Sequence, residues 1–245
     1  TMIFEGSGGA DAMLEAAERK IYALRQGRNV GGLQPISMVI QRVYANLSEA
    51  ASSGGGIPGL ATGLPDLDQT ILGLNAGELI LIAARPGMGK SSFALNIALN
   101  VARRYPEKSV VMFSLEMSNE QLVSRAMASE ARIDNNKLRV GNLNADEWVQ
   151  LASCADVLSR MNFYFSDAAG VTVNDIKAKL LRLKDVGLVV IDYLQLMSSG
   201  RRTENRVQEI SQMTRNLKIM AKELDVPVIL LSQLSRAAEQ RQGHK

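Results

Sequence analysis

Apolar runs and helical stripes alternate through most of the chain. Nearly continuous apolar runs predict five buried strands, at 78–84, 109–114, 162–166, 187–192 and 226–232. Apolar stripes at helical spacing predict five helices, at 89–104, 118–131, 144–160, 173–185 and 204–224. This alternation predicts an α/β fold in which a mainly parallel central sheet is flanked by helices. Ligands of such sheets bind beyond the carboxyl ends of the strands, so functional residues are sought there.

The first part of the chain has a different pattern. Apolar residues at spacings of three and four predict a helix over 10–25, which has glycines on both sides. Its apolar face needs a partner, either the chain's own core or another subunit, and the pattern leaves both open. A second helix is predicted over 35–51, where a proline suits the first turn. The glycine-rich linker at 52–59 then predicts a helical segment over 1–55 and a larger domain over 56–245.

Composition narrows the chemistry. The 245 residues are 46% apolar and 22% charged, as in a globular protein with one large domain and an appendage. Neither a signal peptide nor an apolar run of the roughly 20 residues that cross a bilayer is visible. We therefore expect a cytoplasmic protein without membrane association, whose chain begins within a longer protein. Cys154 is the only cysteine and fits a helical core position, and the sole histidine, His244, argues against a histidine base or a histidine-ligated metal.

A glycine-rich turn follows the first strand of the larger domain. Residues 84–91 read Ala-Arg-Pro-Gly-Met-Gly-Lys-Ser. This pattern is typical of a P-loop, whose backbone N–H groups and helix N-terminus cradle the phosphates of a nucleoside triphosphate. Lys90 is predicted to reach the β- and γ-phosphates, and the Ser91 hydroxyl to hold Mg²⁺. The predicted nucleotide-binding residues are Ala84 (in place of the usual first glycine), Arg85, Pro86, Gly87, Met88, Gly89, Lys90, Ser91 and Ser92.

Polar residues stand at the ends of three other predicted strands. Asp192 ends the fourth strand and is predicted to serve Mg²⁺ beside Ser91, directly or through a water, with a turn cap as the alternative. Glu116 follows the second strand. It is either a base that orients water for attack on the γ-phosphate or a first-turn carboxylate of the next helix. Gln233 ends the last strand and either hydrogen-bonds the γ-phosphate or is solvated.

Basic residues gather between the fourth strand and the last helix. Arg201 and Arg202 lie in a short polar loop, and Arg206 follows closely. The net charge of +3 permits a polyanionic partner without requiring one. Aromatic residues make up only 4% of the chain, so bound nucleic acid is expected to be held through its phosphates. An ordinary solvated loop is the alternative.

Four motifs occur in a specific order. They are Ala84–Ser91, Phe113-Ser-Leu-Glu-Met117, Val190-Ile-Asp-Tyr-Leu-Gln-Leu-Met197 and Leu231-Ser-Gln-Leu-Ser-Arg236, preceded by Thr62-Gly-Leu-Pro-Asp-Leu-Asp68. In these motifs and their spacing the whole chain resembles the RecA-like motor domain of bacterial replicative DNA helicases of the DnaB type. The resemblance implies a RecA-like P-loop NTPase core preceded by an α-helical linker segment.

The resemblance also implies an activity and partners. A hexameric ring encircles single-stranded DNA and, with Mg²⁺, hydrolyses ATP between neighbouring subunits to move 5′-to-3′ and unwind duplex. In that family the residues matching Glu116, Asp192 and Gln233 activate water, serve Mg²⁺ and report the nucleotide state toward the DNA; with Lys90 they are the predicted catalytic residues. The segment 10–25 matches the linker helix that packs on the adjacent subunit. The loop with Arg201 and Arg202 falls where the family's central-channel DNA loop lies.

Further partners and alternatives follow from the same resemblance. A helicase loader and primase are expected, primase through an amino-terminal domain outside this chain. The family's arginine finger lies in a segment after Lys245, so this chain alone is expected to bind ATP and hydrolyse it slowly. A RecA-like recombinase, a clock-type ATPase, and a regulatory nucleotide-binding scaffold remain alternatives on the same core.

Overall fold

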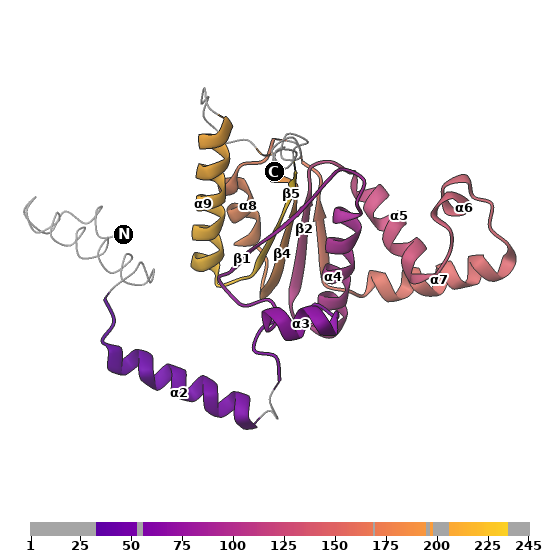
Figure 1. Ribbon diagram of the computed structural model, residues 1–245. Helices are drawn as coiled ribbons and strands as arrows, with labels where there is room; N and C mark the ends of the chain where they lie inside the picture. Colours follow the sequence, from indigo (N-terminus) through magenta and orange to yellow (C-terminus); the bar gives the residue numbers. More distant parts are fainter. Residues whose placement is uncertain (1–32, 53–55, 169, 195–196, 198–205, 235–245) are drawn as a thin grey trace, which may run out of the picture. The chain divides into compact units, whose positions relative to one another are not determined.

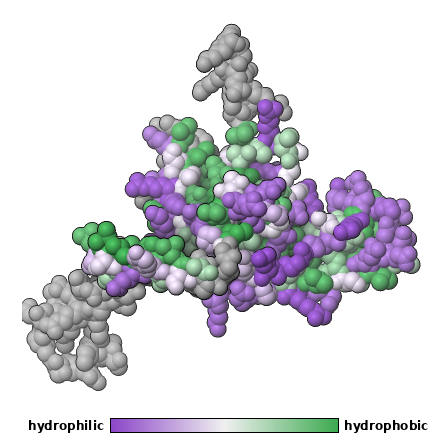
Figure 2. All heavy atoms as spheres, turned by 60° about the horizontal axis from the view of Figure 1, so that its bottom comes forward, coloured by the Kyte–Doolittle hydropathy of each residue, from purple (hydrophilic) through white to green (hydrophobic). Residues whose placement is uncertain are grey.

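The structure is a computed structural model that describes residues 33–52, 56–168, 170–194, 197 and 206–234 (Figure 1). The chain divides into two compact units, Thr1–Gly56 and Ile57–Lys245. The predicted helix over 10–25 lies outside the described residues. In the first unit, α2 spans Ile36–Ser52. Its large apolar side chains, among them Val39, Val43 and Leu47, are exposed on the surface of this helix (Figure 2).

The second unit contains a five-stranded sheet in which every pairing is parallel. Its strands are β1 (Leu79–Ala84), β2 (Ser109–Ser114), β3 (Phe163–Ser166), β4 (Val186–Asp192) and β5 (Val228–Gln233), in the spatial order β1-β5-β4-β2-β3. Its helices are α3 (Pro65–Ile71), α4 (Lys90–Arg104), α5 (Asn119–Glu130), α6 (Asn135–Val140), α7 (Ala145–Ser159), α8 (Val173–Leu180) and α9 (Arg206–Leu224). All five predicted strands are present, which confirms the α/β prediction.

Helices cover both faces of the sheet (Figure 1). Alternate residues of each central strand point to opposite faces, so the strands contribute to two separate cores. On β2, Val110 and Met112 belong to the cluster that includes α4 and Leu122 of α5. Val111 and Phe113 belong to the cluster on the α8 and α9 face. Because β2, β4 and β5 are buried on both sides, their sequences are apolar without alternation.

One helical prediction needs correction, and two short helices were not predicted. The helix predicted over 173–185 ends at Leu180. The chain then turns, with Asp185 at a φ of 47°, and the backbone carbonyls of Lys184 and Asp185 accept hydrogen bonds from Ser109 at the start of β2, at 2.8 Å each. The short helices α3 and α6, of 7 and 6 residues, were not predicted, since neither is long enough to show a helical period.

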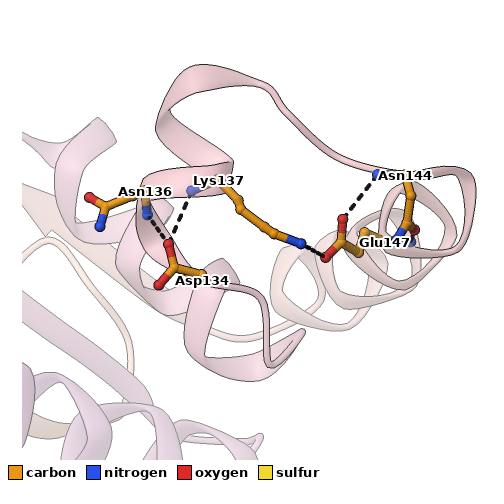
Figure 3. Close-up of polar contacts among 5 residues, drawn as sticks. All are labelled: Asp134, Asn136, Lys137, Asn144 and Glu147. Atoms are coloured by element: carbon orange, nitrogen blue, oxygen red, sulfur yellow. Dashed lines mark hydrogen bonds and ion pairs between the residues drawn. The ribbon is translucent and has the colours of Figure 1, made fainter.

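Side-chain caps begin four helices of the second unit. Capping boxes begin α5, α7 and α8, at Ser118, Asn144 and Thr172. In the projection formed by α5, α6 and α7, Glu147 accepts from the Asn144 amide and pairs with Lys137, while Asp134 caps α6 (Figure 3). The hydrogen bond from Asn144, followed by that from Lys137, lowers the pKa of Glu147. No described helix is long and apolar enough to cross a membrane.

Candidate functional site

The predicted P-loop joins the end of β1 to the start of α4. Gly87 and Gly89 have φ angles of 78° and 82°, in the left-handed region that favours glycine. A Cβ built on either would meet no atom within 4 Å, so the backbone angle rather than crowding requires glycine. Gly89 is the N-cap of α4 and has no side chain to accept from the first-turn amides. Those amides, at the positive end of α4, are therefore available to an external anion.

Lys90 begins α4 and lies beside Asp192, the last residue of β4. Its Nζ is 3.4 Å from Asp192 Oδ1 and 4.4 Å from the centre of the Tyr193 ring. The Asp192 side chain is fully buried, and the described residues donate no hydrogen bond to either carboxylate oxygen. A buried carboxylate with one cation and no hydrogen bonds is costly, and among the described residues Asp192 accepts no hydrogen bond that would cap a turn.

A pocket of about 450 Å³ opens at the carboxyl end of the sheet. It brings together residues from three strand ends and two helices. Its lining residues are Ala84, Arg85, Pro86, Gly87, Gly89, Lys90, Ser91, Ser92, Glu116, Met117, Arg125 and Gln233. The structure therefore gathers Glu116 and Gln233 with the P-loop, although they are far apart in sequence.

Strand register explains why Gln233 reaches this pocket. β5 is hydrogen-bonded directly to β1, and Gln233 is paired in register with Ala84, the first P-loop residue. The amide of Leu234 donates to the Ala84 carbonyl at 3.1 Å, which fixes the end of β5 against the loop. The end of β5 and the start of the P-loop are therefore hydrogen-bonded to each other.

Some predicted site residues are placed differently. Met88 is an exposed loop residue and does not line the pocket. Asp192 lies beneath Lys90 rather than on the pocket wall. Arg201 and Arg202 fall outside the described residues, and Arg206 is the first residue of α9.

Arg125 is a pocket residue that sequence reasoning missed. It comes from α5 and adds a basic residue to the lining of the pocket. It stands on an exposed helix position without any local motif, so only the packing of α5 against α4 could reveal it.

The donor set fits a magnesium ion that keeps most of its waters. Among the described residues, no group of three or more His, Cys, Asp or Glu side chains could hold a metal. One carboxylate, Asp192, and one hydroxyl, Ser91, are what Mg²⁺ uses when phosphate oxygens and waters complete its shell. The two Asp192 oxygens without hydrogen bonds agree with this assignment.

Comparison with known proteins gives the family. The model of the family described as "DnaB-like helicase C terminal domain" matches residues 59–245. The chain belongs to this family. The replicative DNA helicase DnaB of Geobacillus stearothermophilus is 44% identical over 239 residues, which are 96% of this chain and 52% of that protein. The replicative DNA helicase DnaC of Bacillus subtilis is 45% identical over 237 residues, 95% of this chain and 52% of that protein.

Solved structures agree with the DnaB-like assignment. One solved ATPase domain superposes with a TM-score of 0.79 at 35% identity, covering 87% of this chain and 76% of that domain. A DnaB-like replicative helicase studied with its primase interactions gives a TM-score of 0.75 at 33% identity, covering 94% of this chain and 56% of the other. The fold is therefore the RecA-like ATPase core. The chain spans about half the length of the curated relatives it matches.

Proposed function

We propose that this DnaB-like chain is the ATP-hydrolysing motor of a replicative DNA helicase that moves along single-stranded DNA. The observation that carries the proposal is the pocket that unites the P-loop, Glu116 and Gln233 beside the buried Lys90–Asp192 pair. A protein that only binds nucleotide needs the P-loop and Lys90, but it has no use for a carboxylate such as that of Glu116 in the same pocket. The relatives named replicative DNA helicases support the same conclusion.

The residues divide the work by position. First-turn amides of α4 and Lys90 would bind the phosphate chain of ATP. Glu116 is exposed to the pocket and can accept a proton from, and orient, an attacking water. Arg125 can bind phosphate oxygens from the opposite wall. Ser91 and Asp192 would hold Mg²⁺, which when bound neutralises charge on the phosphate oxygens.

The pocket also suggests how hydrolysis is coupled to DNA. Gln233 reaches the pocket from β5, and the chain then continues from the same sheet edge. A side chain that hydrogen-bonds the terminal phosphate can move when that phosphate is lost, and this movement would pass to the segments beyond Asp192 and Gln233. We propose that these segments, with Arg201, Arg202 and Arg206, contact the DNA backbone, and that the motor works as a hexamer through the segment 10–25.

Lys90→Ala in the full-length protein tests the proposal. We expect ATP hydrolysis to fall about 100-fold or more and DNA unwinding to be lost, because a preorganised cation is removed from the phosphates. Circular dichroism should report an unchanged fold. Lys137→Ala is the matched control, since Lys137 also loses an ion pair, to Glu147, but lies outside the pocket. Undiminished unwinding by Lys90→Ala would refute the proposal.

Glu116→Gln separates a motor from a nucleotide-binding scaffold. The variant should bind ATP with wild-type affinity in calorimetry while its hydrolysis falls to a small residual rate. A wild-type protein that binds ATP but shows no hydrolysis for this substitution to remove would instead be a scaffold. Strand exchange on filaments, in place of strand separation, would indicate a recombinase.

A further inference from the structure

The strand β2 has a buried serine at each end, and the two serines make different contacts. Ser114, at the carboxyl end, is 1% exposed. Its hydroxyl donates to the Met117 carbonyl at 2.7 Å and accepts from the Met117 amide at 3.2 Å. One side chain thus holds both backbone groups of the residue that follows Glu116.

A second bond holds the residue that precedes Glu116. The amide of Leu115 donates to the main-chain carbonyl of Asp192 at 2.6 Å. Ser114 and Asp192 are also register partners in the parallel pairing of β2 with β4. The turn that carries Glu116 is therefore attached on one side to β4 and on the other to the Ser114 hydroxyl.

We propose that Ser114 is a positioning residue for Glu116, and this inference rests on the proposed ATPase function. Glu116 has an exposed, flexible side chain, so the place of its carboxylate depends on the backbone of its turn. The Ser114 hydroxyl fixes that turn relative to the strand end. Displacing a catalytic group by about 1 Å can reduce the rate about 100-fold, which makes such a contact consequential. Ser114 itself does not line the pocket and touches no reacting atom.

Ser109 supplies a matched control within the same strand. It is 2% exposed, and its hydroxyl donates to the Lys184 carbonyl at 2.8 Å. Both serines therefore bury one hydroxyl that donates to a backbone carbonyl, but Ser109 lies at the edge of the sheet opposite the pocket. If strand-end serines serve stability alone, alanine at the two positions should have the same consequences.

The test compares Ser114→Ala with Ser109→Ala in the full-length protein. We expect Ser114→Ala to lower kcat for ATP hydrolysis about 10-fold or more with little change in KM, and Ser109→Ala to leave both unchanged. Ser114→Thr, which retains a hydroxyl, should restore most of kcat. Hydrogen exchange provides a readout that needs no nucleotide: the Met117 amide, which donates to Ser114 Oγ, should exchange faster in Ser114→Ala and not in Ser109→Ala.

A double-mutant cycle decides whether Ser114 acts through Glu116. In a Glu116→Gln background, Ser114→Ala should cause no further loss of residual hydrolysis, because the two residues act as one unit. Additive losses, equal effects of the two serine variants, or unchanged Met117 exchange would each overturn the positioning role. Absence of hydrolysis in the wild-type protein would contradict the proposed function instead, and unchanged Met117 exchange would still overturn the Ser114 contact.

Discussion

Two buried aspartates in different regions of the larger unit differ in the partners that surround their carboxylates. Asp68, in α3, is 4% exposed and Asp192, at the end of β4, is fully buried. Asp68 accepts from the Thr62 amide at 2.8 Å, the Thr62 hydroxyl at 2.7 Å and the Gly63 amide at 3.3 Å. Asp192 accepts no hydrogen bond from the described residues and has Lys90 as its ion-pair partner.

The difference in hydrogen bonding reflects what each region must do. The Leu60–Leu74 bridge closes the segment 60–74, and the Thr62 carbonyl accepts a hydrogen bond from Asn100 on α4. Asp68 therefore belongs to a hydrogen-bonded network that needs no further partner. Asp192 is left incomplete where a ligand would bring further partners. A buried carboxylate whose oxygens all accept hydrogen bonds stabilises the fold. One whose oxygens accept none lowers the stability of the fold but can still bind a ligand.

The largest expected effect comes from Asp192→Asn. Asparagine keeps the shape and removes a buried charge that only Lys90 neutralises, so the lost ion pair is offset by a smaller desolvation cost and thermal stability without nucleotide should change little. ATP hydrolysis should fall about 100-fold or more, because the carboxylate assigned to Mg²⁺ is gone. Thermal unfolding and steady-state hydrolysis on the same samples check both expectations. Marked destabilisation would show that Asp192 is a structural residue like Asp68.

Asp68→Asn should behave in the opposite way. One carboxylate oxygen is replaced by a donor that faces either Thr62 or Gly63, so the free energy of unfolding should fall by about 2 kcal/mol. Hydrolysis per folded molecule should be unchanged, since Asp68 does not line the pocket. Denaturant unfolding below the melting temperature measures the loss. If Asp68→Asn reduced ATP hydrolysis as strongly as Asp192→Asn does, the proposed difference between the two aspartates would be wrong.

Sequence patterns located the sheet and the P-loop because both are local signals. Uninterrupted apolar runs mark strands buried on two faces, and Gly87 and Gly89 mark a turn that needs positive φ. The same runs placed Glu116, Asp192 and Gln233 at one sheet edge. The structure shows that Glu116 and Gln233 line one pocket, whereas the mechanistic role of each remains a prediction.

What the sequence did not predict depends on long-range packing. Arg125 enters the pocket only because α5 packs against α4, and no spacing rule connects it to the P-loop. The turn after α8 is held by hydrogen bonds from Ser109, which lies far away in the chain. The strand end singled out Asp192 in the sequence, but the hydrogen bonds that engage Asp68 and are absent from Asp192 are visible only in the structure.

The smallest expected effect concerns a half-buried carboxylate whose oxygens, like those of Asp68, accept local hydrogen bonds. Glu147 closes the capping box of α7, and its pKa is lowered by the Asn144 hydrogen bond and by Lys137. A lowered folded-state pKa adds stability above the ordinary value of 4.5, and that stability is lost as pH falls through the folded-state value. Glu147→Gln should therefore be slightly less stable than wild type at pH 7, and the difference should vanish in acid. Thermal unfolding of Asp146→Asn, in the same first turn but outside the capping box, is the control for the removal of a first-turn charge.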